Sequence, residues 1–138
     1  MGRHSGDPID TDRSTRGQGL AYGLAALLTF TGSAHFFDAG FFRPLIPEQL
    51  GSADPWVYGS GLAELACAAA VAAPRTRRIG GYAAAALFIA VFPGNIQMAL
   101  DAGDRSATYQ ALTYARLPLQ VPLVIWGIAV ARRAPRQR

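Results

Sequence analysis

Residues 80–92, GGYAAAALFIAVF, decide the fold class of this chain, because they place no polar stripe on any face of a helix. A helix on the surface of a soluble protein keeps such a stripe for water, whereas a helix in lipid does not need one. Residues 63–73, AELACAAAVAA, have no such stripe either. These segments therefore favour membrane helices over a soluble four-helix bundle of the same size.

Apolar residues gather in four blocks, at about residues 18–37, 56–73, 79–100 and 108–131. Blocks of about 20 residues are long enough for a helix to cross a hydrocarbon core of about 30 Å. We therefore predict an all-α integral membrane protein with a four-helix transmembrane domain over residues 18–131. Residues 1–17, which are rich in Gly, Ser, Asp and Arg, are expected to form a disordered cytoplasmic tail. Residues 132–138 are expected to form a basic cytoplasmic tail.

The arginines indicate the orientation of these helices. Arginine supplies all 13 basic residues, and ten of them flank the apolar blocks on one side. The loops on the other side carry only Arg43 and Arg105 beside five acidic residues. By the positive-inside rule, the protein is a multi-pass plasma-membrane protein with both termini in the cytoplasm. The net charge of +4 is thus a topology signal, and no nucleic-acid motif accompanies it. A cleaved signal peptide is the alternative for the first block, because residues 30–35, FTGSAH, contain small residues.

Two interruptions separate or bend the predicted helices. Residues 36–56 are too polar and proline-rich to span the membrane and too apolar to lie in water. They are therefore expected to form an interfacial lid between the first two helices. In the third helix, Pro93 is expected to produce a kink and to free a backbone carbonyl near residue 89.

Each predicted helix carries a polar side chain near the same end. By the rise of an α-helix, these side chains lie about 5–12 Å from the outer ends of their helices, and they are His35, Glu64, Asn95 and Arg116. A charge facing lipid costs about 2.5–3.5 kcal/mol, so these groups are expected to face the bundle interior. Similar depth and opposite charge predict an ion pair between Glu64 and Arg116.

These polar groups define a candidate site. Glu64 and His35 are the candidate catalytic residues, since either could move a proton while Arg116 or Asn95 steadies an anion. Helical spacing adds neighbours on the same faces, so the binding candidates are Arg116, Asn95, Gln120, Tyr109, Thr113 and Ser60. We expect an amphipathic pocket that opens outward and is bounded by Phe41 and Phe42.

Each candidate also has a structural interpretation. The pair of Glu64 and Arg116 could be a tie between helices, and His35 an interfacial side chain. Asn95 and Gln120 could form hydrogen bonds that only hold helices together. The single cysteine excludes paired-cysteine disulfide chemistry, and His35 alone cannot supply both axial ligands of a haem. A metal site of His35 and Glu64 would be short of ligands, so no metal is predicted, and the sequence does not identify a cofactor.

The same residues resemble the DoxX-like family of small four-helix bacterial membrane proteins. The resemblance covers about residues 20–131, and its motifs are His35 followed by GLAEL (61–65), FPGN (92–95) and RLPLQ (116–120). Some members of that family are linked to thiosulfate or quinone redox chemistry and others to the maturation of redox enzymes. The resemblance thus implies a subunit or accessory protein of a redox system in the bacterial inner membrane.

Three functions are consistent with these observations. The first, which rests on the resemblance, places the polar site next to a quinone or a redox partner protein. The second is an outer-leaflet pocket that binds a membrane lipid or isoprenoid, or alters it by acid–base chemistry of the isomerase or cyclase type. The third is a structural or assembly factor without a ligand.

Overall fold

The computed structural model describes residues 8–135, and every regular element in this range is helical. The long helix α1 (Pro8–Phe37) is followed by the connecting segment, residues 38–52, which contains α2 (Ala39–Phe42), η1 (Arg43–Leu45) and η2 (Glu48–Leu50). The remaining helices are α3 (Ala53–Ala72), α4 (Arg77–Ala90), α5 (Phe92–Leu100) and α6 (Ala107–Arg133). The predicted all-α class is confirmed.

Three helical stretches are long and apolar enough to cross a membrane, namely Ser14–Phe37, Arg77–Leu100 and Ala107–Arg133. Only 22–28% of these stretches is buried inside the protein. Large apolar side chains such as Phe30 and Ile79 are 75% and 74% exposed. Exposed apolar surface of this extent is typical of a region that lipid covers. The structure is therefore compatible with a multi-pass membrane protein.

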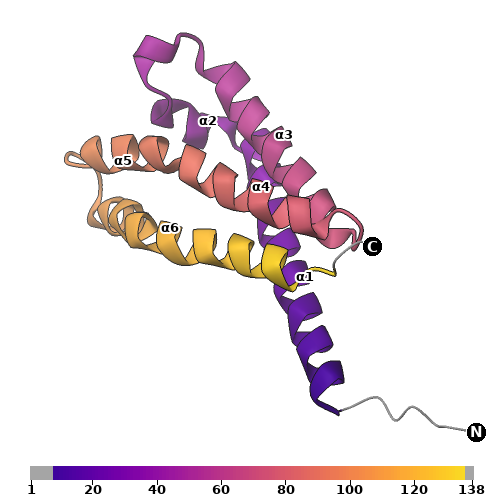
Figure 1. The fold of residues 1–138 in the computed structure, drawn as a ribbon. Coiled ribbons are helices and arrows are strands. Elements are labelled where there is room, and N and C mark those ends of the chain that lie inside the picture. Colours follow the sequence, from indigo (N-terminus) through magenta and orange to yellow (C-terminus); the bar gives the residue numbers. More distant parts are fainter. Residues whose placement is uncertain (1–7, 136–138) are drawn as a thin grey trace, which may run out of the picture.

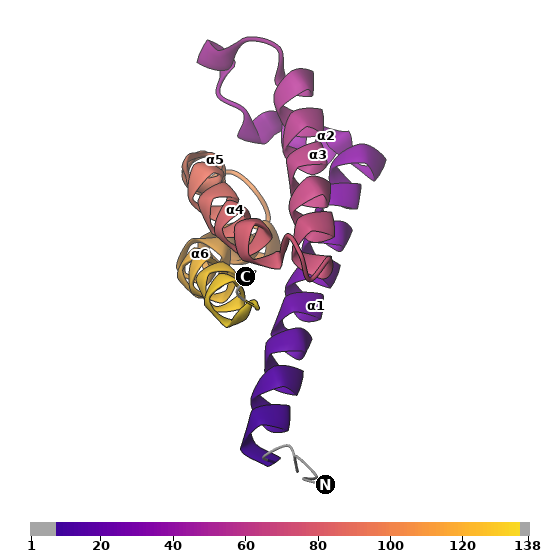
Figure 2. The same cartoon turned by 45° about the vertical axis from the view of Figure 1, so that its right-hand side comes forward.

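The long helices form two pairs that enclose a wedge (Figures 1 and 2). α1 packs along α3, while α4 and α5 pack along α6. The pairs meet near the short turn between α3 and α4 and near the end of α6, and they diverge toward the opposite end. At that wide end α2 packs on α1 and α3, and η1 contacts both α3 and α5. The first turns of α1 project beyond the other helices.

Glycines allow the helices to approach closely at their crossings. A Cβ atom on Gly61 of α3 would lie 2.6 Å from the Cβ atom of His35 on α1. A Cβ atom on Gly81 of α4 would lie 2.7 Å from the backbone nitrogen of Ala131 on α6. Gly80 likewise faces the backbone of α3, with 2.6 Å to the nitrogen of Val71. Small residues at such contacts are a common means of helix association in membranes.

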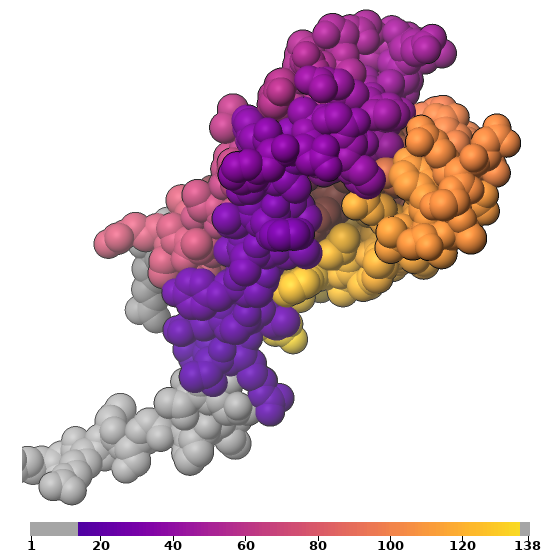
Figure 3. Space-filling model, turned by 180° about the vertical axis from the view of Figure 1, so that it is seen from behind, coloured from indigo at the N-terminus to yellow at the C-terminus, as the bar shows by residue number. Residues whose placement is uncertain are grey.

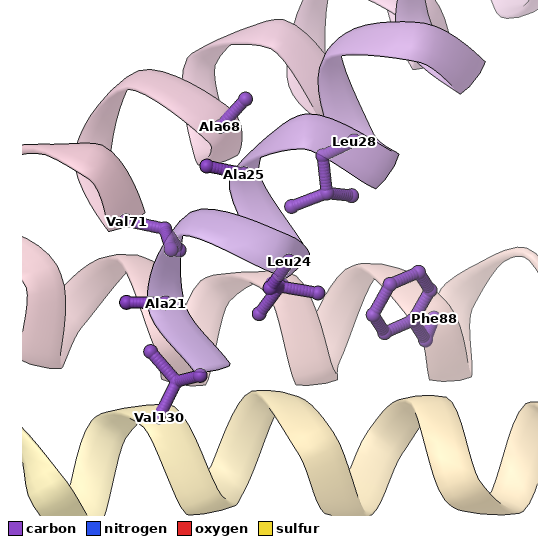
Figure 4. Close-up of a cluster of buried hydrophobic side chains, with 9 residues drawn as sticks. Ala21, Leu24, Ala25, Leu28, Ala68, Val71, Phe88 and Val130 are labelled. Carbon is purple, nitrogen blue, oxygen red and sulfur yellow. The ribbon is translucent and has the colours of Figure 1, made fainter. Parts of the chain in front are cut away.

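The hydrophobic core lies where the two pairs meet. It joins all four long helices, as Figure 4 shows, and its members are Ala21, Leu24, Ala25, Leu28, Ala68, Val71, Ala84, Phe88 and Val130. The indole nitrogen of Trp126 also donates a hydrogen bond of 2.9 Å to the carbonyl of Leu20 and so ties α6 to α1. The wide end of the wedge has no comparable apolar filling among the described residues.

Two helix boundaries differ from the predicted ones. α1 begins at Pro8, so residues 8–17, predicted as part of a tail, continue the helix. Extending an existing helix costs far less than nucleating one, and proline is well tolerated in a first turn. α6 runs to Arg133, two residues beyond the predicted end at residue 131, which is within the usual uncertainty of helix ends. The predicted tails at residues 1–7 and 136–138 lie outside the described residues.

The predicted interruption of the third helix is confirmed. α4 ends at Ala90, α5 begins at Phe92, and Pro93 lies in the first turn of α5. Proline lacks the N–H group that would continue the hydrogen-bond ladder. The interruption places α5 and its polar residues beside the wide end of the wedge.

Candidate functional site

The wedge between the helix pairs contains a pocket of about 410 Å³. All four long helices, α5 and the connecting segment contribute to its wall. Its polar lining consists of Thr31, His35, Ser60, Glu64, Asn95, Arg116 and Gln120. Apolar residues such as Leu27, Phe88 and Leu123 form much of the rest. This volume and this mixture are typical of small-molecule sites.

The pocket opens through the side of the bundle. Figure 3 shows a hollow between α1 with the connecting segment, drawn in indigo to purple, and α6, drawn in orange to yellow. Two side chains of the pocket wall, Phe30 on α1 and Leu119 on α6, are 75% and 55% exposed. α1 and α6 are both candidate membrane spans, so this opening would face lipid. This opening differs from the predicted one, which lies at the outer end of the bundle.

Glu64 and His35 lie in contact inside the pocket. The Nε2 atom of His35 is 3.4 Å from a carboxylate oxygen of Glu64, and the hydroxyl of Thr31 donates to the other oxygen. His35 is only 9% exposed, and its Nδ1 atom is buried without a hydrogen-bond partner in the described structure. Because Gly61 has no side chain, α1 and α3 approach closely enough for these contacts.

The predicted ion pair between Glu64 and Arg116 is wrong. Both side chains line the pocket, but within residues 8–135 they do not lie within ion-pair distance of each other. Arg116 instead places a guanidinium nitrogen 4.0 Å from the sulfur of Met98. Glu64 belongs to the α1–α3 pair and Arg116 to the α4–α6 pair, so the divergence of the pairs separates the two charges. Helical depth alone could not show this separation.

Asn95 and Gln120 connect α5 to α6. The amide nitrogen of Asn95 donates to the amide oxygen of Gln120 over 3.2 Å. The amide nitrogen of Gln120 donates in turn to the carbonyl of Phe88, near the end of α4. This carbonyl lies next to position 89, where the sequence predicts an available acceptor. Gln120 is only 7% exposed, so this chain of hydrogen bonds stabilises the interrupted helix from inside.

Two of the eight candidate residues lie away from the pocket. Tyr109 packs its ring against the guanidinium of Arg105 at 5.5 Å, and Thr113 donates to the carbonyl of Gln110. Neither lines the pocket, because α6 presents only its middle turns to the wedge. Thr31 does line it and was not among the candidates. Its position four residues before His35 on the same helical face was a usable signal.

The connecting segment makes ring contacts with both sides of the pocket. The ring of Phe42 stacks on His35 with 3.8 Å between ring centroids. Phe41 contacts Phe42 edge to face at 5.2 Å, and the guanidinium carbon of Arg116 lies 5.8 Å from the Phe41 ring. Phe42 lines the pocket together with Leu45 and Ile46, whereas Phe41 does not. The two phenylalanines thus join α1 to α6 across the wedge.

A second hollow, of about 650 Å³, lies between the connecting segment and α5. Its polar groups largely pair with one another or with close neighbours. Arg43 donates to Asp54 over 2.6 Å, and the hydrogen bond and charge of Asp54 raise the pKa of the Arg43 guanidinium. Gln97 donates to Asp101 over 2.9 Å. Both pairs are exposed to solvent, so this hollow is a weaker candidate than the pocket.

Residues 24–131 match the model of a family described as "Domain of unknown function (DUF8561)". The match covers most of the chain, so the protein belongs to this family. It includes every residue that lines the pocket. No curated protein and no solved structure matches the chain.

Proposed function

We propose that this member of the DUF8561 family binds an amphipathic molecule dissolved in the membrane, of the quinone or isoprenoid class. The observation that carries the proposal is the pocket itself, which combines a buried Glu64–His35 contact with an opening between two candidate membrane spans. Apolar side chains at the opening suit a hydrocarbon chain or ring. The polar side chains inside suit a head group.

The proposed setting is a four-span protein of the bacterial plasma membrane. α3 is not among the three candidate membrane spans, but its 20 residues are enough for about 30 Å of membrane. Its charged Glu64 faces the pocket rather than lipid. In this arrangement the connecting segment lies at the outer interface and serves as the lid of the pocket, supported by the stacking of Phe42 on His35.

The proposed role is that of a subunit or accessory protein of a membrane redox system. Its support is the resemblance to the DoxX-like family, together with a pocket that is large enough for a quinone ring. A quinone takes up two protons when a redox partner protein supplies two electrons. The contact between Glu64 and His35 would provide a path for those protons.

A second candidate function is acid–base catalysis on an isoprenoid. The contact of 3.4 Å between His35 and Glu64 favours it, because a carboxylate and an imidazole can act as proton donor and acceptor on one substrate. The reaction would be of the isomerase or cyclase type, which moves protons without an electron partner. Chemical analysis of the bound molecule separates this function from the first.

Filling the pocket should remove the bound molecule. Gly94 lines the pocket, and a Cβ atom there would meet only the carbonyl of Leu45 at 3.7 Å. Gly94→Leu should therefore fold, and its side chain should occupy part of the pocket. We expect mass spectrometry of extracts from the purified wild-type protein to show an amphipathic molecule in near-stoichiometric amount, and the variant to lack most of it.

Gly103→Leu is the matched control, because a Cβ atom on Gly103 would meet nothing within 4 Å. This variant should retain the molecule as the wild type does. Equal amounts in the wild type and in Gly94→Leu would contradict binding in the pocket. An empty wild-type protein would favour the third function, a structural or assembly factor.

The topology can be tested with reporter fusions. The arginines flanking one side predict that a fluorescent protein fused after Arg138 folds in the cytoplasm and fluoresces. Alkaline phosphatase inserted after Gly103, between α5 and α6, should be active because it reaches the opposite side. Active phosphatase after Arg138 would overturn the proposed orientation.

A further inference from the structure

Arg116 presents a positive charge to the pocket without a negative partner. Among the described side chains, its guanidinium contacts the sulfur of Met98 at 4.0 Å and the ring of Phe41 at 5.8 Å. No carboxylate of residues 14–135, the range whose side chains the structure describes, lies within ion-pair distance of it. An arginine carries five N–H donors and stays charged at all relevant pH values. Most of its hydrogen-bonding capacity is therefore available to a ligand.

The carboxylate in the same pocket is already engaged. Both oxygens of Glu64 contact groups on α1, the Nε2 atom of His35 and the hydroxyl of Thr31. On the α1–α3 side of the pocket, the negative charge of Glu64 has polar partners. On the α6 side, the positive charge of Arg116 has no carboxylate partner among the described side chains. Charged side chains inside a membrane normally pair, because an isolated charge is costly in a medium of low dielectric constant.

We infer that the ligand is an amphipathic anion whose carboxylate or phosphate group pairs with Arg116 while its apolar part lies along the opening between α1 and α6. This inference rests on the pocket of the proposed function and selects one part of its ligand class, because an isoprenoid can carry a phosphate or carboxylate group whereas a quinone carries neither. A guanidinium binds either oxyanion through two parallel hydrogen bonds. The hydroxyl of Ser60, which also lines the pocket and has no protein partner among the described residues, is a second available donor.

A pair of probes that differ only in charge tests the inference. The fluorescent polyene cis-parinaric acid and its methyl ester share one apolar chain, and only the acid has a carboxylate. Their binding to the wild-type protein in nanodiscs of uncharged lipid can be followed by energy transfer from Trp56 and Trp126, at a pH where the acid is ionised. We expect the acid to bind at least about tenfold more tightly, since a charge-assisted hydrogen bond is worth more than a neutral one.

Variants assign this preference to one residue. Arg116→Gln should bind the acid and the ester equally, whereas Arg116→Lys should retain part of the preference. Arg105→Gln removes an arginine at the same end of the protein that does not line the pocket, so it should behave as the wild type does. If Arg116→Gln fails to fold, the comparison of acid and ester in the wild type still shows whether the pocket prefers an anion, and Arg116→Lys shows whether Arg116 is responsible.

Competition identifies the source of the anion. Dodecyl phosphate should displace the acid, while dodecanol and inorganic phosphate should not. If inorganic phosphate displaced the acid and dodecyl phosphate did not, the inference would be wrong, because the site would then bind a free anion. If the wild type bound the acid and the ester equally, the inference of an anionic ligand would be wrong. If Gly94→Leu then lost this binding, the proposed pocket would still stand. Absence of binding by either probe would contradict both the inference and the proposed function.

Discussion

Replacing Gly61 by alanine is expected to destabilise the helix bundle strongly, whereas replacing Gly59, two residues earlier in α3, is not. A Cβ atom on Gly61 would lie 2.6 Å from the Cβ atom of His35 and 2.9 Å from the carbonyl of Gly32. Neither neighbour is the flexible end of a side chain, so α1 and α3 would have to separate. Overpacking of this kind typically costs about 1–3 kcal/mol in the free energy of unfolding.

Gly59→Ala is the matched control, because a Cβ atom there would meet nothing within 4 Å. Alanine is a better helix former than glycine, so this change should raise stability by about 0.4–1 kcal/mol. Thermal unfolding of the two purified variants in one detergent measures the difference. Equal melting temperatures would mean that α1 and α3 do not approach as closely as the structure shows. If Gly59→Ala lost stability and Gly61→Ala did not, the face of α3 that packs on α1 would be the one that carries Gly59.

Replacing Glu64 by glutamine is expected to abolish the proposed proton transfer while leaving the protein folded. The amide has nearly the same shape as the carboxylate and keeps an oxygen near the hydroxyl of Thr31. It cannot accept or release a proton, and such groups typically contribute about 10²–10⁴-fold to a rate. The measurement compares the lipid and quinone content of membranes from a strain that lacks this protein and is supplied with either the wild type or Glu64→Gln.

Two further variants separate a chemical role of Glu64 from a structural one. Glu64→Ala leaves His35 and Thr31 without their shared partner, which should cost about 1–3 kcal/mol of stability. Glu48→Gln removes an exposed carboxylate outside the pocket and should change neither activity nor stability. Wild-type activity in Glu64→Gln, together with loss of stability in Glu64→Ala, would leave Glu64 as a tie between α1 and α3.

Hydrophobic patterning predicted the helical class, and the missing N–H group of Pro93 predicted the interruption, because both are local properties of the sequence. The start of α1 was missed for a related reason. Polar residues 8–17 give no hydrophobic signal, but a helix that has formed nearby extends through them at little cost. The second helix was predicted from residue 56 and begins at Ala53, within the usual uncertainty of helix ends.

Depth along each helix predicted that His35, Glu64, Asn95 and Arg116 would lie at a common level, and all four do line one pocket. Depth says nothing about the distance between two helices at that level. The predicted ion pair between Glu64 and Arg116 was therefore wrong. Glu64 contacts His35 across the glycine-lined approach of α1 and α3, whereas Arg116 lies on the other side of the wedge.

The sequence by itself determined which segments are helical, which helical faces carry polar groups and at which segment ends the arginines lie, because these properties follow from the periodicity and composition of single segments. Only the tertiary structure decided that the four long helices separate into two pairs. That division depends on which glycines meet across helices, as Gly61 meets α1 and Gly81 meets α6. Contacts between distant segments leave no periodic signal in one chain. The divergence of the two pairs opens the pocket and leaves Arg116 without a carboxylate partner.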